Sequence, residues 1–273
     1  MQQVNKAYIK QVSKEEFLIC TQLLPKIKRE FGNVFSRLIL PEVVFECIHQ
    51  SNVYTVLFKY YNGKYYNEIW NEEDGGSLLG LELVNEMINI IEDLLNIDIE
   101  YLYQTEEVKQ INGFVFNYQD WLKSYTIRFD KAIQVGISTE ELEKAKDFLE
   151  DGFSRKKLIF SNGDFYPRNL IKVNNGQQLV LIDWEYWGEN FRVNYVDHLE
   201  NIIAFAYIHM WGNVNWQNEF LKSAINNFNL RLDDLRKSIM IKSFEQAILW
   251  LDYPQFSNFQ TEHFRRALSN QLI

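Results

Sequence analysis

A series of short apolar runs and polar turns between residues 158 and 185 constrains the fold of this chain more than any other part of it. Leu158–Phe160 and Leu170–Val173 are apolar runs that flank a polar segment. A third run, Leu179–Ile182, follows a tight turn at Asn174–Gly176. Apolar runs of this length on both sides of an Asn-Gly signal are typical of a β-hairpin. The sequence therefore predicts a hairpin here.

Three polar side chains fall at one end of this predicted hairpin. Asp164 and Asn169 come before its first strand, and Asp183 lies just beyond the next one. Carboxylate and carbonyl oxygens are the ligands that Mg²⁺ prefers, together with phosphate oxygens. We therefore expect a magnesium site at this end. The alternative is an acidic, aromatic hairpin surface that carries no chemistry.

The spacing of these residues resembles the catalytic loop of kinases, in which an Asp precedes an Asn by five residues and a second Asp follows on the next hairpin. Gly163–Asp164, Pro167 and Ile182–Glu185 further resemble the aminoglycoside phosphotransferase and choline kinase superfamily. That family usually writes the loop as His-Gly-Asp-x-x-x-x-Asn. Here Asn162 stands in the place of His, which alters the hydrogen bonds that orient the loop.

The resemblance implies a role for each of the three polar residues. Asp164 is expected to accept the proton of a substrate hydroxyl, Asn169 to hold one Mg²⁺, and Asp183 to bridge Mg²⁺ to the phosphates of ATP. The implied cofactors are therefore ATP and Mg²⁺.

Composition bounds the class of protein. A hydrophobic fraction of 47% and an aromatic fraction of 15% in 273 residues are typical of a globular chain with a substantial core. A net charge of −9 argues against general nucleic-acid binding, which needs clustered Lys and Arg. Cys20 and Cys47 are too few for a disulfide framework, and no signal peptide or membrane span is visible. We expect a cytoplasmic protein that does not bind membranes.

The N-terminal segment predicts a phosphate-binding pair. Residues 7–12 alternate as a short strand does, and Ser13 begins a helix with Glu16 three residues later. Kinases place a lysine on such a strand and a glutamate on the following helix, where both grip the α- and β-phosphates. Lys10 and Glu16 fit that order, with Glu30 as a rival partner. Alternatively, Glu16 only caps its helix and Lys10 is a solvated strand residue.

Two further strands, Pro41–Cys47 and Tyr54–Lys59, are expected to complete a small sheet. Lys59, Tyr60 and Tyr61 follow, where the family has its linker between lobes, so their backbone is expected to bind the adenine. The family's Gly-rich phosphate loop comes before the lysine strand, and residues 1–9 contain no such turn. Either this lobe is abbreviated, or the start is truncated, or another segment covers the phosphates.

The rest of the chain reads as mainly helical. A strong three-and-four apolar repeat predicts a long helix after residue 77, and residues 117–135 and 139–153 predict two more. Four helices are expected over residues 199–210, 216–227, 232–250 and 261–272. In the family a buried Asp braces the catalytic loop, and Asp197 has that place.

The substrate side is less defined. Trp184 and Trp187 adjoin the predicted metal site, and with Glu185 they suit an amine-bearing ligand through charge and cation–π attraction. Relatives phosphorylate aminoglycosides, choline, sugars and other amino alcohols, and no short motif chooses among them.

The predicted fold is therefore α+β and kinase-like: an abbreviated N-terminal β-lobe over residues 1–63 and a mainly helical C-terminal lobe over residues 64–273 that carries catalysis and substrate binding. The predicted function is ATP- and Mg²⁺-dependent transfer of the γ-phosphoryl group to a hydroxyl of a small molecule. The alternative is a degenerate kinase-like module that binds a ligand or partner without turnover. A kinase of protein substrates is less favoured, because the region after Asp183 lacks an Ala-Pro-Glu anchor.

Overall fold

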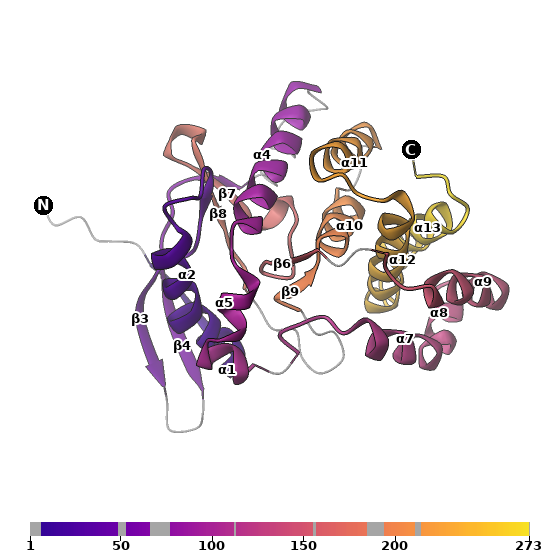
Figure 1. Ribbon diagram of the computed structural model, residues 1–273, viewed down its shortest axis with the longest axis horizontal. Helices are drawn as coiled ribbons and strands as arrows, with labels where there is room; N and C mark the ends of the chain where they lie inside the picture. Colours follow the sequence, from indigo (N-terminus) through magenta and orange to yellow (C-terminus); the bar gives the residue numbers. More distant parts are fainter. Residues whose placement is uncertain are drawn as a thin grey trace, which may run out of the picture. The chain divides into compact units, whose positions relative to one another are not determined.

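The computed structural model describes residues 7–48, 53–65, 77–111, 113–154, 157–184, 194–210 and 214–272. They belong to two compact units (Figure 1). Unit 1 comprises Met1–Phe114 and Ile159–Val196, and unit 2 comprises Val115–Leu158 and Asp197–Ile273. Neither unit has a boundary at residue 63. The division into lobes at that residue stays a prediction.

The first sheet of unit 1 carries Lys10 on its inner face. Its strands are β1 (Ala7–Val12), β4 (Tyr54–Lys59) and β3 (Val43–Ile48), in the order β1-β4-β3 and antiparallel throughout. Lys10 stands opposite Val56, which is fully buried. Residues directly opposite each other in a sheet share a face, so Lys10 lies on the buried side.

The helix after β1 continues past Pro25 by changing its geometry. α1 (Lys14–Leu18) begins at Ser13, whose hydroxyl accepts a hydrogen bond from the backbone N–H of Glu16 at 3.0 Å. The chain then passes through a π-helical turn, η1 (Ile19–Leu23), into α2 (Leu24–Phe31). Pro25 sits in the first turn of α2, where its missing N–H costs little. Phe17 packs on Tyr54 of β4, with ring centroids 5.0 Å apart.

A second sheet contains the predicted hairpin. β7 (Leu170–Val173) and β8 (Gln178–Leu181) pair antiparallel across the turn η3 (Asn174–Gly176), which confirms that prediction. The sheet order is β2-β8-β7-β5, with β2 (Leu38–Ile39) parallel to β8 and β5 (Lys64–Tyr65) antiparallel to β7.

The remaining elements of unit 1 are helical or short. α4 (Ser77–Leu95) confirms the predicted long helix, and its apolar stripe is buried. It is followed by α5 (Ile99–Tyr103) and α6 (Glu106–Lys109). A 3₁₀ turn, η2 (Pro167–Asn169), precedes β7. β6 (Leu158–Phe160) and β9 (Val196–His198) form a two-stranded sheet, and each of these strands contains a boundary between the two units. No pattern in the sequence predicts β9.

The second unit is helical in its described part. Figure 1 shows α12 (Leu232–Leu249) between α10 (Leu199–His209) and α13 (Pro254–Leu268), and it packs against both. The other helices are α7 (Tyr118–Ile127), α8 (Phe129–Gln134), α9 (Thr139–Glu150) and α11 (Val214–Phe228).

Two expected helix boundaries in this unit are wrong. The single helix expected over residues 117–135 is interrupted at Arg128, whose ψ of 6° departs from helical geometry. The last helix begins at Pro254 instead of residue 261, because proline is well suited to the first turn.

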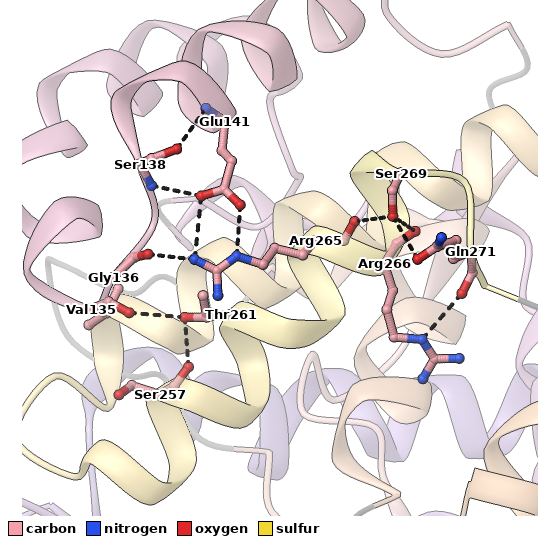
Figure 2. A network of polar contacts seen from close by, with 10 residues as sticks. All are labelled: Val135, Gly136, Ser138, Glu141, Ser257, Thr261, Arg265, Arg266, Ser269 and Gln271. Atoms are coloured by element: carbon pink, nitrogen blue, oxygen red, sulfur yellow. Dashed lines mark hydrogen bonds and ion pairs between the residues drawn. The ribbon is translucent and has the colours of Figure 1, made fainter.

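A group of hydrogen bonds around Arg265 joins α13 to the start of α9 (Figure 2). Ser138 and Glu141 form a capping box at the N-terminus of α9. The guanidinium of Arg265 donates to Glu141 Oε1 at 2.7 Å and to the carbonyl of Gly136 at 2.6 Å. The hydrogen bond from Arg265, together with those involving Ser138, lowers the pKa of Glu141 against the opposing effect of burial. Throughout the described residues, the helices are all too short or too polar to cross a membrane.

Candidate active site

The register of the hairpin brings Asn169 next to Asp183. Leu170 pairs with Leu181, and beyond that pair the backbone N–H of Ile182 donates to the carbonyl of Asn169 at 2.9 Å. The residues before β7 and after β8 therefore lie side by side. This is the arrangement that the sequence predicted for the end of the hairpin.

The side chain of Asn169 is fixed against Asp164. Its amide nitrogen Nδ2 donates to the Asp164 carboxylate oxygen Oδ2 at 2.8 Å and to the Asp164 carbonyl at 2.9 Å. Asn169 is buried, whereas Asp164 is partly exposed. These two hydrogen bonds set the orientation of the amide, because a carbonyl oxygen in the place of Nδ2 would face two acceptors. The other atom of this amide, the side-chain oxygen Oδ1, then points away from Asp164 and can face a ligand.

Lys10 joins the N-terminal strand to both Glu16 and Asp183. Its ammonium nitrogen Nζ lies 3.1 Å from Glu16 Oε1 and 3.2 Å from Asp183 Oδ1, although Lys10 and Asp183 are 173 positions apart. The side chains are 18%, 6% and 30% exposed for Lys10, Glu16 and Asp183. The structure thus decides between the rival partners, since Glu30 lies near Arg29 on the surface.

The backbone is bent sharply at both acidic loops. Asp183 has φ +59°, in the left-handed region that non-glycine residues rarely enter, and Gly163 has φ +72°. Asn162 lies between these bends and is fully buried. Its amide nitrogen donates to the carbonyl of Ile182 at 2.9 Å.

The donor set at this site fits Mg²⁺. Asp164, Asp183 and Glu16 together outweigh the single positive charge of Lys10, so the local charge favours a divalent cation. Asn169 and Asp183 offer a carbonyl and a carboxylate oxygen, both of which are magnesium ligands. Over the described ranges, no group of three or more His, Cys, Asp and Glu side chains could hold a metal ion by itself. Phosphate and water oxygens would therefore complete the coordination, which is usual for Mg²⁺.

The predicted linker is a short turn between strands. Lys59 and Tyr60 are exposed, and Tyr61 is partly buried, with its hydroxyl accepting a hydrogen bond from the backbone N–H of Glu42 at 3.0 Å. Gly63 is required here, because a Cβ atom would collide with the carbonyl of Lys172. Whether this backbone binds an adenine stays a prediction.

Trp184 is a packing residue in this structure. It is 2% exposed, its indole N–H donates to the Leu181 carbonyl at 2.9 Å, and its ring stacks on Phe160. So little exposed surface leaves its ring without a face for the amine-bearing ligand that the sequence suggested, so this prediction is wrong for Trp184. Glu185 and Trp187, the other predicted substrate residues, lie outside the described residues.

Asp197 belongs to unit 2, where it forms a buried ion pair. Its carboxylate accepts hydrogen bonds from Lys242 Nζ at 3.0 Å and from the Asn201 amide at 2.7 Å. The Asp197 charge counters desolvation and helps to raise the pKa of Lys242. Its expected role as a brace of the catalytic loop stays a prediction.

Sequence reasoning missed two groups beside the acidic cluster. Burial and the nearby Asp164 carboxylate raise the pKa of Tyr166 to about 12. The pKa of the Cys20 thiol is also raised, mainly by burial and to a smaller extent by the negative charge of Glu16. The position of Tyr166 two residues after Asp164 was a usable signal, but nothing in the sequence marked Cys20.

Comparisons with known proteins indicate a family from the sequence and a fold from the structure. The family model for choline/ethanolamine kinase matches residues 81–219. The structure is similar to that of a thermostable mutant of the aminoglycoside phosphotransferase APH(4)-Ia (TM-score 0.60, 14% identity, 90% of this chain and 81% of that one). It is also similar to a GDP complex of an aminoglycoside 2′-phosphotransferase IIIa mutant (TM-score 0.64, 11% identity, 94% and 82%). Identities this low show the fold alone. A comparison with curated protein sequences finds no match.

Proposed function

This chain belongs to the choline/ethanolamine kinase family, and on that premise we propose that it is an ATP- and Mg²⁺-dependent phosphotransferase acting on a hydroxyl of a small molecule. The acceptor is an aminoglycoside, choline, a sugar or another amino alcohol. The use of ATP, together with free Cys20 and Cys47, fits a cytoplasmic location.

The observation that carries the proposal is the position of Lys10 between Glu16 and Asp183, at 3.1 and 3.2 Å. A surface pair of this length means little, but here three charges converge from two distant parts of the chain, and Glu16 is almost fully buried. Burying charges costs free energy, and enzymes often gather such charges at the sites where they bind ligands, so the cluster supports a binding role. An ammonium group beside a magnesium-binding carboxylate suits the phosphates of a nucleotide.

In the proposed reaction, the acceptor oxygen forms a bond to the γ-phosphorus while the bond from that phosphorus to the β–γ bridging oxygen breaks, which releases ADP. Asp164 accepts the hydroxyl proton. Asn169 holds Asp164 Oδ2 at 2.8 Å, which turns the carboxylate in one direction and keeps its rotamer fixed. Catalysis of this kind rests on positioning and on charge placed in advance.

Asn169 and Asp183 would hold Mg²⁺, which supplies positive charge beside the phosphates when it is bound. Lys10 contributes a further positive charge, and Glu16 keeps its ammonium group in place. The backbone of Lys59, Tyr60 and Tyr61 would hydrogen-bond the base. A thermostable mutant of the similar aminoglycoside phosphotransferase APH(4)-Ia forms a ternary complex with ADP and hygromycin B, which supports a nucleotide and a small-molecule acceptor as the two ligands here.

The test is a screen of aminoglycosides, choline, other amino alcohols and sugars for acceptor-dependent release of ADP from ATP and Mg²⁺. We expect at least one acceptor to raise ADP release above the acceptor-free rate. Nucleotide binding without ADP release on the whole panel would favour the rival, a binding module without turnover, which rests on Asn162 in the place of the family's His. Absence of nucleotide binding would contradict the proposal outright.

A further inference from the structure

Asn162 connects the two loops that carry the acidic residues. Its side chain is fully buried, and the amide nitrogen Nδ2 lies 3.3 Å from the Asp164 carbonyl, 2.9 Å from the Ile182 carbonyl and 3.2 Å from the Asp183 carbonyl. The latter two carbonyls are 20 and 21 positions further along the chain. One amide group thus contacts both the Asp164 loop and the segment after β8.

The orientation of this amide is unambiguous. Three carbonyl oxygens surround Nδ2, and rotating the amide by half a turn would place another oxygen against them. The carbonyl oxygen Oδ1 of Asn162 is buried and, as far as the described residues go, accepts no hydrogen bond. An orphaned buried acceptor costs stability. The side chain is therefore held for what its N–H groups do.

Those N–H groups act on a strained backbone. Asp183 adopts φ +59°, a conformation that persists only where its surroundings impose it. Asn162 binds the carbonyls of both Ile182 and Asp183, on either side of that strained φ. A change in this contact would let the Asp183 backbone relax and turn its carboxylate away from Asn169.

We propose that Asn162 is a positioning residue, which fixes the Asp183 carboxylate relative to Asp164 and thereby sets the geometry of the metal–nucleotide site. The metal part of this inference rests on the proposed function. An amide has two N–H donors, whereas a neutral imidazole has one. Asn162 can therefore bond the Asp164 carbonyl and the Ile182–Asp183 segment at the same time, whereas a neutral histidine would have one N–H to share between them.

Nucleotide titration with and without Mg²⁺ tests the role in metal binding. Asn162→Leu keeps the approximate volume and removes both donors. We expect its affinity for ADP without Mg²⁺ to stay near the wild-type value. The gain in affinity on adding Mg²⁺ should fall by about tenfold or more, the usual cost of losing a group that orients a metal ligand. Asn162→His, with one N–H, should restore part of that gain.

Gln260→Leu is the matched control. Gln260 is also fully buried, donates to a backbone carbonyl (Ile208, 3.2 Å) and has an orphaned amide oxygen, but it lies in unit 2. Gln260→Leu should lower thermal stability and leave the gain in ADP affinity on adding Mg²⁺ unchanged. A folded Asn162→Leu or Asn162→His protein with the full Mg²⁺ effect overturns the proposal. So does an equal loss of affinity with and without Mg²⁺, which would indicate general damage to the site.

Hydrogen exchange separates this inference from the proposed function. In the ligand-free protein, Asn162→Leu should speed amide exchange in the segments around Gly163 and Asp183, and Gln260→Leu should not. If the wild type binds no nucleotide, the proposed function fails while the exchange result still decides whether Asn162 ties the two loops. Unchanged exchange in both segments refutes the tie. Should Asn162→Leu not fold, Asn162→His is measured in the same way.

Discussion

At the scale of single residues, the ammonium group of Lys10 forms ion pairs with Glu16 and Asp183. We expect only the ion pair with Asp183 to change when the ligands bind. It neutralises part of the charge of Asp183, which is the residue proposed to hold Mg²⁺, and it is also the cation proposed for the phosphates. Without a nucleotide, the ammonium group and a metal ion compete for the same carboxylate. The metal is therefore expected to bind together with the nucleotide, whose phosphates draw the ammonium group away from Asp183.

Replacing Lys10 by Gln should consequently have opposite effects on the two ligands. Nucleotide affinity should fall about ten- to a hundredfold, because a charge-assisted contact is lost. Affinity for Mn²⁺ alone, measured by paramagnetic resonance, should rise, because Asp183 loses its competing cation. Lys28→Gln, which removes an exposed lysine near Glu42, is the control for net charge. Equal affinities of Lys10→Gln and wild type for the nucleotide would place the phosphates elsewhere.

Asp164 should act on turnover more than on binding. Once an acceptor is known, Asp164→Asn should lower kcat by about 10²–10⁴-fold, the usual effect of losing a positioned base. The affinity for an ATP analogue should stay near wild type, since the new side chain still accepts a hydrogen bond from Asn169. Asp120→Asn, at an exposed position on α7, controls for charge. Full kcat in Asp164→Asn contradicts the assignment.

The residues of the site were predictable where local spacing determines their position. Asp164, Asn169 and Asp183 belong to one hairpin, so the Asn-Gly turn and the strand lengths suffice to bring them together. Trp184 shows the limit of that reasoning. Its position beside the motif predicted contact with an amine-bearing ligand. Its ring instead stacks with Phe160 and Tyr195, and no local pattern in the sequence predicts that packing.

At the scale of elements, one carboxylate organises the start of β2. The buried side chain of Asp93, on α4, accepts hydrogen bonds from the backbone N–H groups of Ser36, Arg37 and Leu38, each at 2.7 Å. Three N–H groups around an anion form a favourable nest. The contact holds the segment that pairs with β8, and hence supports the hairpin from its other side.

Asp93→Ala should destabilise the protein by about 3 kcal/mol or more, because it leaves several buried donors without a partner. Asp93→Asn should cost less, since it keeps one acceptor oxygen. Chemical denaturation measures both, and Glu92→Ala, at the exposed neighbouring position, should change the unfolding free energy by about 0.5 kcal/mol or less. A cost for Asp93→Ala as small as that of Glu92→Ala would show that water replaces the carboxylate.

Elements with strong periodic or turn signals were predicted well. β1, β4, the hairpin and α4 all appear where the sequence placed them. The misses have specific causes. Pro254 was not used as a helix start, and the break at Arg128 carries no Gly or Pro to announce it. The strand β9 is three residues long and is defined by its pairing with β6, which is a tertiary property.

At the scale of the whole molecule, two histidines with low pKa values, the buried His263 and the partly exposed His209, predict sensitivity to acid. Burial lowers the pKa of His209 to about 4 and that of His263 to about 3. The folded protein therefore keeps both rings neutral, whereas the unfolded chain takes up protons below its ordinary pKa of about 6.5. Stability should be lost as the pH falls from about 6.5 towards 4, by roughly 3 kcal/mol for His209 alone.

Thermal unfolding followed from pH 7 to pH 4 measures this loss. His209→Gln removes one titrating ring, so its unfolding free energy should depend less steeply on pH over the same window, even if the variant is less stable at pH 7. The slopes of variant and wild type are compared, because carboxylates such as Glu141 add their own acid dependence to both. Identical slopes would mean that His209 is protonated in the folded protein.

The pairing of early with late segments has a consequence for how the protein is made. The Arg37 side chain donates a hydrogen bond to the carbonyl of Gln177, which is 140 positions later in the sequence. Lys10 forms its ion pair with Asp183, which is 173 positions later. A ribosome releases the N-terminus first, so the nascent chain displays β1 and α1 long before their acidic partner is translated. Contacts so distant in sequence form slowly, and exposed strands invite misassembly meanwhile. Synthesis must therefore proceed past Asp183 before Lys10 can meet its partner and the site can form.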